Sequence, residues 1–103
     1  LDRLQSRPDF PKPGLVAYFR GEVFRKRRAP GDDKRALDAY AAALELPGHP
    51  VETLRDLGYA FRRTFDVESA NQAFADYLAA RPDADDRELI EHLMTQPVRD
   101  HED

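Results

Sequence analysis

The sequence predicts an all-α fold, and three observations support that prediction. Alanine is plentiful, valine, isoleucine and threonine are scarce, and no segment alternates apolar and polar residues as a strand does. Apolar residues instead recur at intervals of three and four, which places them on one face of a helix. Proline and glycine interrupt this pattern repeatedly, at Pro30-Gly31, Pro47-Gly48 and Pro82. The chain therefore reads as a series of helices joined by short turns.

Two helices are expected before residue 49. The first runs from Gly14 to the break at Ala29. The second begins at Asp32 or Asp33, whose carboxylate can accept a free amide of the first turn. The residues expected to face the core are Leu15, Tyr18, Phe19, Val23 and Phe24 in the first helix and Ala36, Leu37, Tyr40, Ala43 and Leu44 in the second.

Three further helices are expected after residue 49. The third runs from Pro50 to near Thr64, and the fourth spans residues 67–80 with Asp66 as its cap. The fifth starts at Asp85, which has capping-box spacing with Glu88, and Pro97 closes it. The expected core residues are Leu54, Leu57, Tyr59 or Phe61, then Ala70, Phe74, Tyr77 and Leu78, and finally Leu89, Ile90, Leu93 and Met94.

The two ends of the chain lack this helical pattern. Prolines make residues 1–13 an extended arm, which we expect Phe10 to anchor, and residues 96–103 form a polar, acidic tail. The chain begins with Leu1 rather than methionine, so we expect it to be part of a longer protein. Its 103 residues suit one domain, here residues 14–95, with too little core for a deep catalytic cleft.

Charge is distributed unevenly along the chain. Residues 83–103 contain eight acidic and two basic side chains, whereas residues 1–82 carry a net charge of +2, for a total of −4. A basic block at residues 20–28 dominates the first part. This asymmetry predicts an acidic end beside a basic face.

Two segments of the chain repeat with a period of 34 residues. Ala36 and Tyr40 recur as Ala70 and Phe74. Residues 51–84 read Leu54-x₂-Leu57-Gly58-x₂-Phe61…Ala70-x₃-Phe74…Pro82, which resembles the tetratricopeptide repeat in all but its tryptophan. The earlier copy, residues 14–48, reads Ala17-x₂-Arg20-Gly21-x₂-Phe24…Ala36-x₃-Tyr40, with arginine in place of a leucine and three extra residues before Gly31.

This resemblance implies a fragment of a right-handed α-solenoid made of two antiparallel helix hairpins. Gly21 and Gly58 would lie where the helices of each hairpin approach most closely, with Ala36 and Ala70 opposite them. Two repeats are fewer than the roughly three that a stable stack usually needs. We expect the fifth helix, residues 85–95, to act as a solvating cap.

The resemblance also implies a peptide-binding groove lined by the first helix of each hairpin. The groove residues that we single out are tyrosines and charged residues. Tyrosine and arginine are favoured in binding hot spots, and arginine recognises carboxylates. They are Tyr18, Glu22, Arg25, Arg55, Tyr59, Arg62 and Arg63. The expected partner is a peptide or protein, acidic in character, and the alternative is that these side chains are merely solvated.

No catalytic or metal-binding pattern is found in the sequence. The histidines, His49, His92 and His101, lack metal-ligand spacing, there is no cysteine, and no phosphate-binding or nucleophile motif is present. We therefore expect no enzyme activity, cofactor or metal. The acidic composition argues against nucleic acid as a partner, and no apolar run is long enough to insert in a membrane.

Two alternatives remain open. Residues 20–25, 30–32 and 81–86 are similar to helical tails of some bacterial zinc metallopeptidases, which would make the chain an accessory or docking domain of a larger enzyme. The chain could also be a homo-oligomerisation unit. The compartment stays open between the bacterial cytoplasm and periplasm.

Overall fold

The computed structural model describes residues 12–96, and every regular element within that range is a helix. The helices are α2 (Pro13–Arg27), α3 (Asp32–Leu44), α4 (Glu52–Arg63), α5 (Val67–Ala80) and α6 (Arg87–Met94). The predicted all-α fold is confirmed. The expected anchor Phe10 and the chain beyond residue 96 lie outside the described residues.

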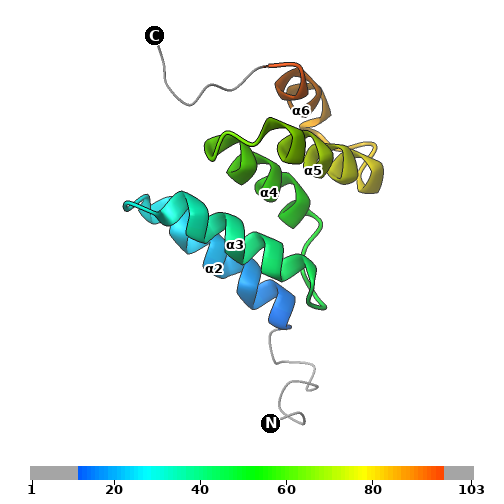
Figure 1. Ribbon diagram of the computed structural model, residues 1–103. Coiled ribbons are helices and arrows are strands. Elements are labelled where there is room, and N and C mark those ends of the chain that lie inside the picture. The colour runs from blue at the N-terminus through cyan, green and yellow to red at the C-terminus, as the bar shows by residue number, and fades with distance from the viewer. Residues whose placement is uncertain (1–11, 97–103) are drawn as a thin grey trace.

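The helices form two hairpins and a final single helix. Helix α2 packs against α3 and α4 packs against α5, while contacts between α3 and α4 join the two hairpins. Helix α6 packs on α5, so α2 and α6 lie at opposite ends of the stack (Figure 1). Each hairpin therefore covers only its neighbour, and the first helix of the stack has one face without a covering helix.

The core consists of two clusters of buried side chains. One cluster lies between the hairpins and contains Ala36, Tyr40, Leu57, Ala60 and Ala73. The other lies between α5 and α6 and contains Ala70, Phe74, Tyr77, Leu78, Ala84 and Ile90. Tyr40, Phe74 and Ile90 are completely buried, which matches the inward faces expected for these helices.

Each hairpin contains one glycine in contact with an aromatic ring. A Cβ atom on Gly21 would lie 2.6 Å from Cε1 of Tyr40, and one on Gly58 would lie 2.4 Å from Cε1 of Phe74. The close approach expected at both glycines is therefore present. The nearest neighbour is an aromatic ring, however, and not the methyl group of Ala36 or Ala70 that we expected.

Helix starts follow the predictions only in part. Asp66 caps α5 as expected, because its Oδ1 accepts a hydrogen bond from the backbone amide of Ser69 at 3.1 Å. The capping box at Asp85 is wrong, since α6 begins at Arg87 after Asp86, whose side chain makes no capping bond. Asp86 is instead used in a contact with α5, described below.

The predicted cap of α3 is also wrong. Gly31 occupies the cap position with φ 84°, and no side chain caps the helix. The buried Asp32 instead accepts hydrogen bonds from Arg27 at 2.8 and 2.9 Å and from Arg35 at 2.8 Å. It also accepts one from the backbone amide of Ala29 at 3.0 Å. The carboxylate thus stabilises the longer turn between α2 and α3 instead of capping the start of α3.

Two helices end on residues other than glycine in the left-handed conformation. Arg28 closes α2 with φ 58° and ψ 35°. Phe65 follows α4 with φ 66°, while the amides of Phe65 and Asp66 bond back to the carbonyls of Arg62 and Phe61, the pattern of a Schellman motif. Glycine is the usual residue at such positions, because a Cβ atom is strained there.

Several residues expected to face the core are exposed. Phe19 is 56% and Val23 is 58% exposed on α2, where Val16 extends the same stripe at 47%. Leu89 on α6 is 53% exposed. The α2 stripe lies on the face of the stack that no other described helix covers.

Candidate functional site

The candidate site lies where α2, α4 and the start of α6 meet. A hollow of about 300 Å³ opens there, and we call it the central hollow. Its lining residues come from three elements and are Arg25, Arg55, Asp56, Tyr59, Arg63 and Asp86. Four of the seven groove residues predicted from sequence are thus brought together, namely Arg25, Arg55, Tyr59 and Arg63.

Tyr18 and Glu22 lie about two turns and one turn before Arg25 on α2, and their side chains join neighbouring helices. The hydroxyl of Tyr18 donates to Oδ2 of Asp56 at 2.6 Å, which links α2 to α4. Glu22 accepts hydrogen bonds from Arg25 at 2.6 Å and from the hydroxyl of Tyr40 at 2.7 Å, which links α2 to α3. These two residues hold the helices that form the hollow.

Burial and hydrogen bonding give the two carboxyl groups opposite properties. Burial raises the pKa of Asp56, and the nearby charge of Glu22 adds to that effect, although Arg55 and Tyr18 act against it. For Glu22, burial also acts to raise the pKa, but hydrogen bonds from Arg25 and Tyr40 outweigh it and lower the pKa to about 2. Glu22 therefore stays ionised well below neutral pH, whereas Asp56 takes up a proton at a higher pH than an ordinary aspartate does.

Arg55 pairs with both acidic side chains that line the central hollow. Its Nε lies 3.0 Å from Oδ1 of Asp56 and its Nη1 lies 3.5 Å from Oδ2 of Asp86. Its guanidinium also lies over the ring of Tyr77, 6.0 Å from the centroid, and Tyr77 donates a hydrogen bond to Asp86 at 2.9 Å. Asp86 is a lining residue that the sequence analysis missed, because its partners lie 9 and 31 residues away with no local pattern.

Arg63 and Arg25 also line a second hollow, beside the first and also of about 300 Å³. Its other lining residues are Lys26 and Arg28, so we call it the basic hollow. The nearest acidic partner of Arg63 is Asp33, with Nε 3.6 Å from Oδ1. One guanidinium nitrogen of Arg63, Nη2, is buried without a hydrogen-bond partner among the described residues.

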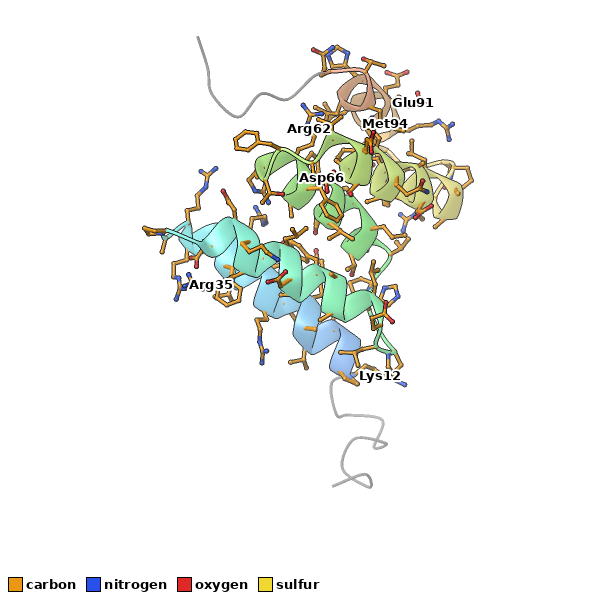
Figure 2. The ribbon with its side chains drawn as sticks, in the orientation of Figure 1. Lys12, Arg35, Arg62, Asp66, Glu91 and Met94 are labelled. Carbon is orange, nitrogen blue, oxygen red and sulfur yellow. The ribbon has the colours of Figure 1, made fainter. Side chains whose placement is uncertain are left out.

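Arg62 does not reach either hollow. It donates hydrogen bonds to the backbone carbonyls of Leu93 at 2.8 Å and Gln96 at 3.1 Å. Met94 follows Leu93 in the chain, and its carbonyl accepts a bond from Asn71 at 3.1 Å (Figure 2 labels Arg62 and Met94). Arg62 therefore ties the end of α6 to the end of α4, and its role here is structural.

Within residues 12–96, no group of three or more histidine, cysteine, aspartate or glutamate side chains is arranged to hold a metal ion. His92 is exposed, and His49 has its Nδ1 3.1 Å from the carbonyl oxygen of Pro50. None of the described helices combines the length and the apolar character required to cross a membrane.

The chain matches no protein-family model, no curated protein and no solved structure at a significant level. Its function must therefore be inferred from its own residues.

Proposed function

We propose that the two hairpins are tetratricopeptide-like repeats, and that the chain is a non-catalytic module that binds an acidic peptide or protein segment in the central hollow. The equivalence of the hairpins supports this view. Gly21 lies against Tyr40 in the first hairpin as Gly58 lies against Phe74 in the second. Tyr40 and Phe74 are 34 residues apart, the length of one such repeat.

The observation that carries the binding proposal is the convergence of Arg25, Tyr59 and Arg63 on one open hollow. The two aspartates in the lining both pair with Arg55, at 3.0 and 3.5 Å. Within residues 12–96, the acidic partner of Arg63 is Asp33, at 3.6 Å, and Nη2 of Arg63 has no hydrogen-bond acceptor there. A guanidinium beside an aromatic side chain is the combination that binding hot spots favour, and it recognises carboxylates through paired hydrogen bonds.

A peptide array tests the proposal. We expect the chain to select acidic peptides, and Arg63→Glu to abolish their binding because it places a negative charge in the hollow. Arg20→Glu is the matched control, since Arg20 lies in a different hollow between α2 and α3 and makes the same charge change. Equal loss with both variants would mean that net charge, and not the central hollow, governs binding.

A second candidate function rests on a different surface. The stripe of Val16, Phe19 and Val23 on α2 is about half exposed along two turns of helix. Exposed apolar stripes of this kind favour packing against another helix. The chain could therefore be an oligomerisation unit or a docking domain of a larger bacterial enzyme. In either case the contact would be made by this stripe on α2.

Light scattering separates this candidate from the first. An oligomerisation unit would give a mass that rises with concentration and returns to that of the monomer in Phe19→Glu. A constant monomer mass for the wild-type chain would exclude self-association. Binding in the central hollow should not change in Phe19→Glu, because Phe19 does not line that hollow.

A further inference from the structure

The basic hollow gathers four cationic side chains from two separate helix ends. Arg25, Lys26 and Arg28 come from the end of α2, and Arg63 comes from the end of α4. Cations at the end of one helix are common, because they interact favourably with the helix dipole. That effect does not explain why a second helix, 35 residues later in the chain, adds another arginine to the same hollow.

The charges in the basic hollow are only partly balanced. Glu22 pairs with Arg25 at 2.6 Å and Asp33 approaches Arg63 at 3.6 Å. Lys26 and Arg28 are exposed, and no ion pair to either is present within residues 12–96. Counted over the described residues, the hollow therefore carries an excess of two positive charges. A carboxylate would cancel one of them, whereas a phosphate monoester, with a charge of about −1.5 to −2, would cancel both.

The unused hydrogen-bond donor of Arg63 also favours a phosphate ligand. Nη2 of Arg63 is a buried donor with no acceptor among the described residues, and such a donor is costly to leave unpaired. An anion bound in the basic hollow would lie beside this guanidinium, because Arg63 lines the hollow. Phosphate offers three acceptor oxygens to a guanidinium fork and to ammonium groups together.

The backbone at Arg28 is a further sign of function. Arg28 has φ 58°, a conformation in which glycine would be free of strain. The backbone amide of Arg28 bonds to the carbonyl of Phe24 at 3.1 Å, but its side chain makes no hydrogen bond or ion pair within residues 12–96, so the fold does not require an arginine at this strained position. A role for its positive charge in the basic hollow would explain why arginine occupies this position.

We propose that the basic hollow binds a phosphate monoester, carried on a phosphorylated side chain of a peptide that lies in the adjoining central hollow. The inference rests on the proposed function, because Arg25 and Arg63 line both hollows and make them one continuous surface. A phosphopeptide fits better than a nucleic acid, since the chain has a net charge of −4 and the excess positive charge suits a single phosphate.

The first experiment titrates the ¹⁵N-labelled chain with O-phosphoserine and, separately, with glutamate. We expect amide shifts at residues 25–28 and 63 with O-phosphoserine and much smaller ones with glutamate. Equal shifts with both ligands, or none with either, would overturn the phosphate site.

The second experiment uses a peptide array in which one central position is serine, glutamate or phosphoserine. We expect the phosphorylated form to bind roughly tenfold or more tightly than the glutamate form, as suits paired charged hydrogen bonds. Lys26→Ala and Arg28→Gly should remove this preference, while the double variant Arg20→Ala/Arg81→Ala, on other surfaces, should keep it. Arg28→Gly also relieves backbone strain, so loss of binding in that variant cannot come from poor folding.

The outcomes separate the two proposals. Equal binding of glutamate and phosphoserine peptides would overturn the phosphate inference and leave the peptide-binding function standing. Shifts with O-phosphoserine but no peptide binding would support the phosphate site and contradict the proposed function. Tighter binding of an oligonucleotide than of any phosphopeptide would overturn the choice of ligand.

Discussion

Gly58 lies against the ring of Phe74 so closely that a Cβ atom on it would be 2.4 Å from Cε1 and 2.6 Å from Cδ1. Phe74 is completely buried, and Tyr59 packs edge-on to it with ring centroids 5.3 Å apart. The ring therefore cannot move aside cheaply. The first hairpin has the same relationship between Gly21 and Tyr40, and Tyr40 is also completely buried.

We predict that Gly58→Ala destabilises the protein, although alanine is the better helix former. The higher helix propensity would contribute about 1 kcal/mol in favour of alanine. Forcing a methyl group into the ring of Phe74 costs about 1–3 kcal/mol, so a net loss of up to about 2 kcal/mol is expected. Urea unfolding at neutral pH measures it.

The matched control for Gly58→Ala is a double-mutant cycle with Phe74→Leu. If the clash with the ring causes the loss, Gly58→Ala should cost less in the Phe74→Leu background than in the wild type. A Gly58→Ala variant more stable than the wild type would contradict the close packing.

We predict that Arg28→Gly stabilises the protein by about 0.5–1 kcal/mol. The gain comes from removing a Cβ atom from a left-handed backbone at φ 58°. Thermal unfolding should show a higher midpoint. Arg20→Gly is a useful comparison, because it places glycine inside α2 and should lower the midpoint by the usual helix penalty.

Tyr18→Phe should lower stability by about 1–2 kcal/mol at neutral pH, because Asp56 loses a hydrogen bond that spans the two hairpins at 2.6 Å. The same hydrogen bond holds the pKa of Asp56 down, so the pKa of Asp56 should rise further in this variant. Carboxyl ¹³C shifts followed through a pH titration measure the second effect. An unchanged pKa would show that Tyr18 does not bond to the carboxylate in solution.

The dependence of folding stability on pH should show the contribution of ionised Glu22. Its pKa is about 2 in the folded chain, and a glutamate in an unfolded chain has a pKa of about 4.3. Its stabilising contribution is therefore complete above about pH 5 and is lost as the pH falls toward 2. Arg27 also holds the pKa of Asp32 below its usual range, so the contribution of Asp32 to stability is likewise lost at low pH. The pKa of Asp56 is raised, so its contribution changes with pH in the opposite direction.

The Glu22→Gln variant isolates that contribution. The difference in unfolding free energy between the wild type and Glu22→Gln should be largest near neutral pH and should shrink steadily between about pH 5 and 2. A difference that does not change with pH would mean that Glu22 has the same pKa in both states.

The sequence predicted the helices well, because the apolar spacing and the Pro-Gly breaks are local signals. All five expected helices are present, with bounds within a few residues of those predicted. The prediction failed at the turns. Asp32 and Asp85 were expected to cap helices. Asp32 instead bonds to Arg27, and α6 begins after Asp86, which pairs with Arg55, a residue that only the folded chain brings near.

The candidate site was predictable in part for the same reason. Arg55, Tyr59 and Arg63 follow helical spacing on α4, and the structure brings them together with Arg25 of α2. Arg62 could not be distinguished from Arg63 by spacing alone, since its direction depends on where α6 ends. The exposure of Phe19 depends equally on tertiary structure, because no described helix covers that side of α2.

The most direct test of the account is calorimetric. The tightest-binding acidic peptide from the array should be titrated into the wild-type chain, Arg63→Ala and the control Arg20→Ala. If the central hollow is the binding site, Arg63→Ala should weaken the affinity by roughly tenfold or more, the effect of losing a charged hydrogen bond, and Arg20→Ala should leave it unchanged. Equal affinities for the wild type and Arg63→Ala would contradict the central claim.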